Sequence, residues 1–248
     1  MKSIFHTKTL QSIFAFVLLC SFNATAQLST EKVQGNGNVI SKKINTADYD
    51  KILVSGSFDV NLVDGKEGNI TIEGEENLIG LITIESNGGQ LKIYPQKGKQ
   101  IRVSNGKKIL ITVPFQTLNE LSVTGSGNVI AKSTIRSTDF STKLTGSGNL
   151  VLNVDIENLE AKLTGSGNFE IKGRASKLDC KVTGSGNFRS YDLKSSNVDA
   201  SVSGSGNSEV YCSGNLQAHV TGSGDIHYKG DPKKKDTKVS GSGTISKA

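Results

Sequence analysis

The stretch Val123-Thr124-Gly125-Ser126-Gly127-Asn128-Val129 decides the fold, because it opens a series of seven near-identical copies. The later copies read LTGSGNL at 144–150, LTGSGNF at 163–169, VTGSGNF at 182–188, VSGSGNS at 202–208, VTGSGDI at 220–226 and VSGSGTI at 239–245. Successive first glycines are 21, 19, 19, 20, 18 and 19 residues apart. So narrow a period indicates a repeat protein, whose units bury their apolar side by stacking on one another.

Apolar residues alternate with polar ones on both sides of each turn. The position two residues before the first glycine is always apolar, and the position four residues after it is apolar in six of the seven copies. A spacing of two places these side chains on one face of a strand. The glycines allow a positive φ where the chain turns sharply. Each copy is therefore predicted to be a strand, a tight turn, a second strand and a shorter return segment.

Two arrangements of such strands fit the period: a coil of parallel strands or a meander of antiparallel hairpins. In a coil, equivalent residues of successive copies lie directly above one another, ~4.8 Å apart. The third position after the first glycine favours the coil, because stacked side-chain amides hydrogen-bond along a column. This predicted turn ladder consists of Asn128, Asn149, Asn168, Asn187, Asn207 and Asp225. We therefore predict an all-β fold, a parallel β-helix-like solenoid with a GSGN turn every ~19 residues.

The N-terminal half lacks the regular turn. Residues 48–115 hold alternating apolar runs, and Ser86-Asn87-Gly88-Gly89 between two of them predicts a hairpin. Segments 34–38 and 54–57 faintly resemble the repeat, Pro114 is expected to close a strand, and no window after residue 26 has helical periodicity. We therefore divide the chain into a signal peptide at 1–26, an N-terminal segment at 27–47, a less regular β-region at 48–115 that joins or caps the coil, and the repeats at 116–248.

The first 26 residues predict export. Lys2, His6 and Lys8 form a basic start, residues 13–20 are apolar but too short for a stable membrane anchor, and an A-x-A cleavage site ends at Ala26. The alternative is a lipoprotein anchored at Cys20, which the bulky Leu19 before it disfavours. We expect an exported protein of the periplasm, the outer surface or the medium, without a transmembrane segment in the mature chain.

The composition bears on two questions, whether the protein binds nucleic acid and what state its cysteines adopt. A formal net charge of +6 with both signs interspersed is weak evidence for nucleic acid, and export argues further against it. Cys180 and Cys212 are the cysteines of the predicted mature chain. An oxidising compartment would permit a bridge between them, but we favour two small buried side chains. Neither cysteine belongs to a C-x-x-C pair, so a structural zinc site is not expected.

Outward positions of the strand before each turn form polar rows. A Thr or Ser directly precedes the first glycine in all seven copies. An acidic row lies five residues before the glycine and includes Glu160, Asp179 and Asp199. Cross-strand pairing with these acids is expected to offset repulsion within a lysine row, at ~0.2–1 kcal/mol a pair. That lysine row, three residues before the glycine, is our candidate surface-contact site: Lys143, Lys162 and Lys181.

Catalytic and metal-binding interpretations of the same residues are weaker. Rungs ~4.8 Å apart would bring carboxylates of the acidic row near the ~5–5.5 Å separation of the two catalytic carboxyl groups in retaining glycosidases. A solvated row of charges is the commoner explanation of such a pattern. So regular a row also lacks a distinct acid and base. His219, Asp225 and His227 lie close in sequence without a recognised ligand spacing. The sequence therefore assigns no catalytic, cofactor-binding or metal-binding residue.

From Tyr49 onward the chain resembles the family called putative auto-transporter adhesin, head GIN domain. The resemblance rests on Phe58-Asp59-Val60-Asn61-Leu62, on Leu91-Lys92-Ile93-Tyr94 and on the series of GSG turns. The sequence departs from the family pattern at Asp225 and Thr244 in the turn ladder and at Ser208 in an apolar row. The resemblance implies a secreted, right-handed β-helix-like protein without a known enzymatic activity or a catalytic motif.

These observations predict an exported, non-enzymatic β-solenoid of the cell envelope or surface that has an adhesin-like, interaction role. Its long polar faces suit multivalent contact with a glycan or an envelope or extracellular protein, where many weak contacts add. One alternative is a carbohydrate-active enzyme of the polysaccharide lyase or hydrolase type on the same fold. Another is a purely structural envelope protein whose open coil ends pair with a partner.

Overall fold

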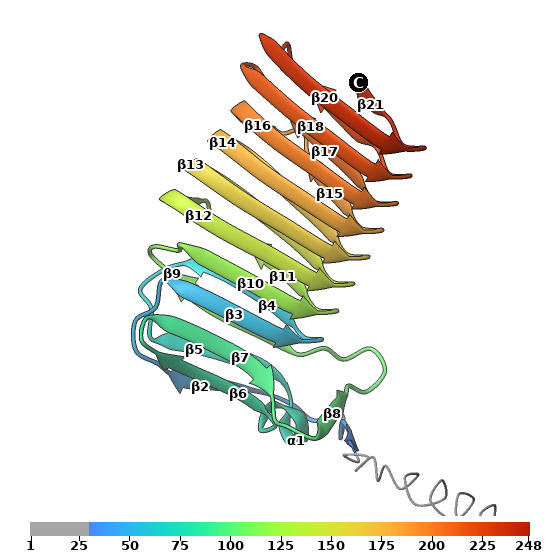
Figure 1. Ribbon diagram of the computed structural model, residues 1–248. Coiled ribbons are helices and arrows are strands. Elements are labelled where there is room, and N and C mark those ends of the chain that lie inside the picture. The colour runs from blue at the N-terminus through green and yellow to red at the C-terminus, as the bar shows by residue number, and fades with distance from the viewer. Residues whose placement is uncertain (1–29) are drawn as a thin grey trace, which may run out of the picture.

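The computed structural model describes residues 30–248, so the predicted signal peptide and Cys20 lie outside the described residues. Figure 1 shows these residues as a stack of β-rungs, with a less regular β-region at the N-terminal end of the stack. The predicted β-solenoid is confirmed, with about seven turns.

One sheet of the solenoid consists of parallel strands that end at the first glycine of each turn. Equivalent residues of successive copies are paired in register, as Gly125 is with Gly146 and Gly146 with Gly165. The parallel register excludes the antiparallel meander. The strands of this first sheet are β3 (Lys51–Gly56), β10 (Glu120–Gly125), β12 (Ile135–Gly146), β13 (Asn149–Gly165), β14 (Asn168–Gly184), β16 (Leu193–Gly204), β18 (Asn215–Gly222) and β20 (Lys234–Gly241).

After each turn the chain enters a second parallel sheet. β13 and β14 are long because each runs from this second sheet through the return segment into the first sheet. Their first residues pair with the shorter strands of the neighbouring rungs. Those shorter strands are β4 (Asp59–Asp64), β11 (Asn128–Ala131), β15 (Asn187–Ser190), β17 (Asn207–Tyr211), β19 (Ile226–Lys229) and β21 (Ile245–Lys247).

The corner between the two sheets requires glycine for two reasons. Gly165 has a φ of 116°, in a region that residues with a side chain rarely adopt. A Cβ atom on Gly165 would also lie 2.4 Å from the carbonyl oxygen of Gly146 on the previous rung. The rungs therefore approach each other more closely at this corner than any side chain permits.

The core is a continuous apolar column between the sheets. The rings of Phe169 and Phe188 on adjacent rungs meet edge to face, with centroids 5.4 Å apart and planes at 76°. Ser208 is next in this column and is fully buried. Its hydroxyl lies 3.7 Å from the Cys180 sulfur, which approaches from the first sheet. Ser208 therefore departs from the apolar pattern but remains a core residue, and its hydroxyl has the Cys180 sulfur as a partner.

The N-terminal region closes the lower end of the column with antiparallel strands. β2 (Val39–Asn45) pairs with β5 (Asn69–Glu75), which also pairs with β9 (Leu110–Phe115). β6 (Ile82–Asn87) and β7 (Gln90–Pro95) form the predicted hairpin, whose turn is Gly88-Gly89. β1 (Glu31–Gln34) and β8 (Lys99–Arg102) make a separate two-stranded sheet. Pro114 is the penultimate residue of β9, so this strand ends where we expected.

The structure adds three details to the sequence analysis of this region. Segment 54–57 is part of a full rung, because Gly56 pairs with Gly125, so the coil begins inside the region expected to be irregular. Segment 34–38 consists of the last residue of β1, Gln34, and the link from β1 to β2, and it is not a rung. A four-residue helix, α1 (Glu76–Ile79), follows β5, although no helical periodicity was visible. Four residues are about one turn, which is too short to show a period of 3.6.

The two ends of the solenoid differ. The first rung strand, β3, lies between β10 and β7 and is paired on both sides. The last, β20, pairs with β18 on one side, and among the described residues no strand pairs with its other side. All eight residues of β20 are exposed. The C-terminal end of the described column therefore has an open strand edge (Figure 1).

Candidate functional site

The outer surface of the first sheet displays three parallel columns of polar side chains, which together we call the ladder face. The predicted lysine row lies in one of them, and Lys143, Lys162 and Lys181 are directly paired from rung to rung. The column continues through His219 to Lys238. The threonine column beside it is Thr124, Thr145, Thr164, Thr183, Ser203, Thr221 and Ser240. The predicted rows are thus real columns, held by the backbone register.

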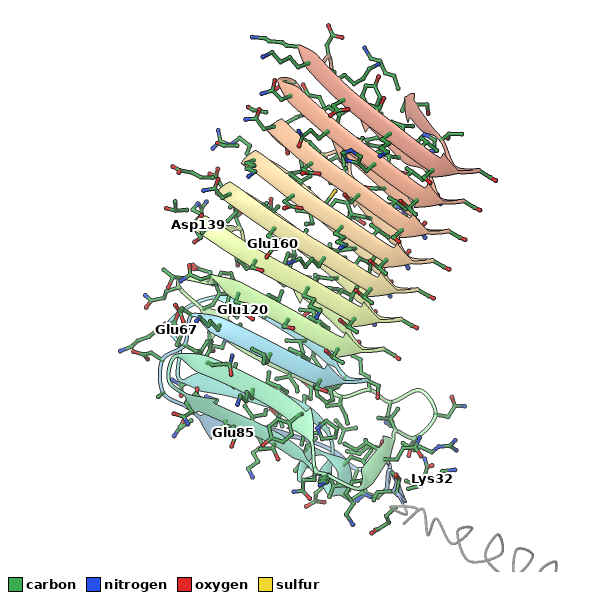
Figure 2. All side chains as sticks on the ribbon, in the orientation of Figure 1. Lys32, Glu67, Glu85, Glu120, Asp139 and Glu160 are labelled. Atoms are coloured by element: carbon green, nitrogen blue, oxygen red, sulfur yellow. The ribbon has the colours of Figure 1, made fainter. Side chains whose placement is uncertain are left out.

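The acidic column lies on the other side of the lysine column. Figure 2 labels Glu120 on β10 and Glu160 on β13, which belong to this column. Its members, in rung order, are Glu120, Ser141, Glu160, Asp179, Asp199, Gln217 and Asp236. Cα pairing along the column places Glu160, Asp179 and Asp199 on three successive rungs, so like charges are neighbours.

The ladder face holds one ion pair among the described residues, between Lys162 and Glu160. Both residues lie on β13, so the pairing runs along one strand and the expectation of cross-strand pairing is wrong. Residues two apart point to the same face, and this spacing brings the two side chains together. The Ser141 hydroxyl also donates to Oε2 of Glu160 at 2.8 Å. Lys162 and then Ser141 hold the pKa of Glu160 below its usual value, and Glu160 raises the pKa of Lys162.

Asp179 on the next rung has the opposite behaviour. Partial burial, followed by the charges of Asp199 and Glu160, raises the pKa of its carboxyl. No lysine or arginine of the described chain makes a salt bridge to Asp179. Two successive carboxyl groups in a regular column therefore differ in pKa, which the sequence analysis did not anticipate.

A shallow groove of about 680 Å³ runs along the edge of the ladder face. Its lining includes Glu160 and Asp179 together with Asp139, Asn158 and Lys177. Nδ2 of Asn158 donates to Oδ1 of Asp139 at 2.9 Å, which orders the outer wall of the groove. In Figure 2, Asp139 lies at the margin of the sheet, beyond Glu160. The groove offers hydrogen-bonding groups and net negative charge to a ligand that lies along the rungs.

The turn ladder forms along the opposite edge of the first sheet. Each asparagine donates through Nδ2 to Oδ1 of the residue on the previous rung, at 2.7, 2.9, 3.2 and 3.3 Å for Asn149, Asn168, Asn187 and Asn207. At the start, Asn128 donates to Oδ1 of Asp59 at 2.8 Å. At the other end, the backbone N–H of Asp225 donates to Asn207 at 3.1 Å, and Thr244 donates to Asp225 at 2.8 Å. The amides satisfy one another, so side-chain hydrogen bonds join each of these rungs to the next.

Asp59 is the ladder member that the sequence analysis missed. It occupies the third position after Gly56, the same position that asparagine has after each of the next five corner glycines. The faint copy at 54–57 carried the signal, but Phe58 replaces the second glycine there. A carboxylate suits this end because it accepts both from the side chain and from the backbone N–H of Asn128.

The remaining candidate residues do not converge. His219 lies in the lysine column, Asp225 in the turn ladder, and His227 on the second sheet with Nδ1 2.9 Å from the Ser246 hydroxyl. No group of three or more metal-ligating side chains is found within residues 30–248. Cys180 and Cys212 are free and buried, and burial raises the pKa of Cys180 to about 12, so its thiol is unreactive.

Comparisons with known proteins agree on the family and on the fold. The family model described as putative auto-transporter adhesin, head GIN domain matches residues 48–232. A putative adhesin from Bacteroides fragilis is 25% identical with a TM-score of 0.81, covering 87% of this chain and 100% of its own. A structure from Parabacteroides distasonis described as a putative lipid binding protein is 29% identical with a TM-score of 0.73, covering 88% and 100%.

A putative adhesin from Parabacteroides distasonis is 27% identical with a TM-score of 0.70, and it covers 88% of this chain and 100% of its own. No curated protein matches the chain. Among the described residues, no helix has the length and apolar character needed to cross a membrane.

Proposed function

The chain belongs to the putative auto-transporter adhesin, head GIN domain family, and from this membership we propose that it is an exported, non-enzymatic β-solenoid with an adhesin-like role. Its ligand is a repetitive one, a glycan or an extended envelope or extracellular protein, and it binds along the ladder face. The periplasm, the outer surface and the medium are the compartments in which such a ligand is met.

The observation that carries this proposal is the register of the ladder face. The hydroxyl column continues through every GSG rung, and lysines and carboxylates recur on successive rungs such as those of Lys162 and Lys181 and of Glu160 and Asp179, at the rung spacing of ~4.8 Å. A ligand with its own repeat meets the same set of groups several times. Each exposed contact is weak, but contacts made within one complex add through effective concentration.

The lysine column supplies the groups that are most accessible to a ligand. Lys143 and Lys181 are exposed and make no salt bridge within the described part of the chain, whereas Lys162 is paired with Glu160. Two free ammonium groups on either side of a neutralised one suit anionic or hydroxyl-rich ligands. The threonine column adds a second row of hydroxyl donors and acceptors beside them.

A binding screen against immobilised polysaccharides and extracellular and envelope proteins tests the proposal. The triple variant Lys143→Glu, Lys162→Glu and Lys181→Glu should bind at least about tenfold more weakly, because it reverses the column's charge. The matched control reverses three exposed lysines outside the ladder face, Lys66→Glu, Lys97→Glu and Lys132→Glu, and should bind within about twofold of the parent chain. Equal weakening in both variants, or none in either, rejects the ladder face as the contact surface.

One observation favours a second candidate, a carbohydrate-active enzyme. The pKa of Glu160 is lowered and that of Asp179 is raised, and both line the same groove. Carboxyl groups whose environments separate their pKa values are the usual pairing of nucleophile and acid. Release of reducing ends from a polysaccharide panel, abolished by both Glu160→Gln and Asp179→Asn, would establish this enzyme. Failure to bind or cleave any ligand would instead favour a structural envelope protein.

A further inference from the structure

A pocket at the N-terminal end of the molecule, away from Lys143, Lys162 and Lys181 of the ladder face, has the features of a ligand site. The segment from Gln96 to Lys108 leaves β7, forms β8 and returns to β9, and we call it the arm. Between the arm and the corner at Gly56–Asp59 lies a pocket of about 300 Å³. This volume is at the lower limit of small-molecule sites, which suits one narrow ligand.

The interior of the pocket is apolar. Phe58 and Ile109 are buried at 5% and 4% exposure and form part of the hydrophobic core, and Ile101 is packed against it. Val103 on the arm is 41% exposed, one of three large apolar side chains with that much exposure among the described residues. An apolar side chain left in water beside a concave apolar surface is a feature that a ligand tail would cover.

The rim of the pocket is basic. Lys99, Lys107 and Lys108 line it, against a single carboxylate, Asp59. Asp59 is engaged in the turn ladder, where its Oδ1 accepts from the backbone and side-chain nitrogens of Asn128. Lys99 is paired with Glu31 at 2.5 Å, whereas Lys107 and Lys108 are exposed and make no salt bridge with any described carboxylate. The rim therefore offers two free ammonium groups to an anion.

The arm is held in place by a buried carboxylate. Glu75 is fully buried, and its two oxygens accept from the backbone N–H groups of Gly37 at 2.6 Å and Ser104 at 2.8 Å. The Ser104 hydroxyl donates to the carbonyl oxygen of Gly35 at 3.1 Å. These bonds anchor the arm between Val103 and Lys107, so the pocket is formed before a ligand arrives. Preformed pockets avoid the entropic cost of ordering a loop on binding.

We propose that this arm pocket binds a single-chain anionic amphiphile, a free fatty acid. Its hydrocarbon tail lies against Phe58, Ile101 and Val103, and its carboxylate lies between the ammonium groups of Lys107 and Lys108. The small volume admits one acyl chain, and the positive rim selects a negative head group over a neutral or cationic one. This site is independent of the ladder face, so either proposal stands if the other fails.

Methyl-resolved NMR of the full chain, labelled at isoleucine and valine, tests this site with dodecanoate kept below its micellar concentration. Saturable shifts should appear at the methyl groups of Ile101, Val103 and Ile109, with Val182, a core residue of β14 behind the ladder face, unaffected. Dodecyltrimethylammonium carries the same tail with the opposite charge, and acetate carries the same head without a tail. Each should bind at least about tenfold more weakly than dodecanoate, because each lacks one of the two complementary features.

Two double variants distinguish the effect of the rim lysines on binding from the effect of the protein's net charge. Lys107→Glu with Lys108→Glu should weaken dodecanoate at least about tenfold, whereas Lys42→Glu with Lys43→Glu, an equal charge change at exposed positions of β2, should leave the affinity within about twofold. Unchanged methyl spectra outside the arm show that each variant is folded. Absence of saturable shifts, equal affinity for the cationic amphiphile, or equal weakening in both variants would overturn the proposal.

Discussion

A single methyl group is enough to disturb the corner of the solenoid. A Cβ on Gly165 would stand 2.4 Å from the Gly146 carbonyl oxygen at a φ of 116°. Backbone atoms of a neighbouring rung cannot move aside without shifting the whole register, so strain and steric overlap act together. Gly165→Ala should therefore destabilise the protein by about 3 kcal/mol or more, measured as the free energy of unfolding in urea.

Gly80 provides the matched control for that substitution. Its φ of −67° is helical, and apart from its own local backbone no heavy atom lies within 4 Å of the position that a Cβ would take. Gly80→Ala should be neutral or stabilising by up to about 1 kcal/mol, since alanine restricts the unfolded chain. Equal effects of the two substitutions would show that the corner glycines are not sterically required.

Neighbouring carboxyl groups of the acidic column should respond to pH with opposite signs. Glu160 has a lowered pKa in the folded state, so its charge stabilises the fold above the ordinary value of 4.5, and this stabilisation is lost as the pH falls through the folded pKa. Asp179 has a raised pKa, so its ionisation opposes folding as the pH rises from 3.8 through the folded pKa. Both groups are partly exposed, and solvent keeps each effect small.

Glu160→Gln should therefore lower the Tm by about 1–3 °C at pH 7, and Asp179→Asn should raise it by a similar amount. Both differences should shrink as the melting series is extended downward in pH through the folded pKa of each carboxyl group, because the charges that cause them are then lost. A difference that persists undiminished at low pH would mean that the substitution changed packing and not charge.

At the level of the strand, the turn ladder couples each rung to the next through side chains as well as backbone. Asn168 donates to Asn149 and accepts from Asn187, at 2.9 and 3.2 Å. Its backbone N–H is already donated to the carbonyl oxygen of Gly148, so it cannot replace the side-chain bond in the way that the N–H of Asp225 does. Loss of the Asn168 amide therefore leaves Oδ1 of Asn149 without its donor and Nδ2 of Asn187 without its acceptor.

Asn168→Ala should cost about 1–3 kcal/mol in urea unfolding, the net value of two hydrogen bonds. Asn168→Asp should cost a similar amount at neutral pH, because a carboxylate cannot donate to Asn149, and should recover stability on acidification. Asn45→Ala is the control, since the exposed Asn45 makes no side-chain hydrogen bond within residues 30–248. Insensitivity of the ladder position to both substitutions would reduce the amide column to ordinary turn chemistry.

For the whole molecule, what repeats in the sequence was predictable and what occurs once was not. The corner glycines and the alternation on either side of them specified the parallel register, the lysine column and the turn ladder. The first rung was not predicted because Asp59 and its partner Asn128 are 69 residues apart in the sequence, and no periodic pattern connects them. Antiparallel pairing of β2 with β5 and the arm held by Glu75 depend on contacts far apart in the chain, which no local pattern announces.

The candidate sites divide in the same way. Residue order placed Lys143, Lys162 and Lys181 in one column, and the spacing of two between Glu160 and Lys162 held the signal for the ion pair within β13. The arm pocket combines residues of β4's corner, β8 and the loop before β9, whose juxtaposition follows only from the fold. Features that occur once therefore become visible only in the structure, whereas features that repeat can be predicted from the spacing of residues in the sequence.

Rung stacking makes stability along the molecule depend on neighbours, and the two ends have different neighbours. β20 is paired on one side and wholly exposed, whereas β3 is enclosed by β7 and β10. In a column of this kind, opening free energies fall toward an unprotected end.

We expect hydrogen exchange of the full chain to be fastest in β20 and β21 among the strands of the rungs and slowest in β13 and β14. β3 should remain protected although it is also a terminal rung strand. Mass-spectrometric deuterium uptake at peptide resolution measures the gradient, and Gly165→Ala should shift it by accelerating exchange in β13 and β14. Uniform protection along the column, or fraying that begins at β3, would contradict a solenoid closed at its N-terminal end and open at the other.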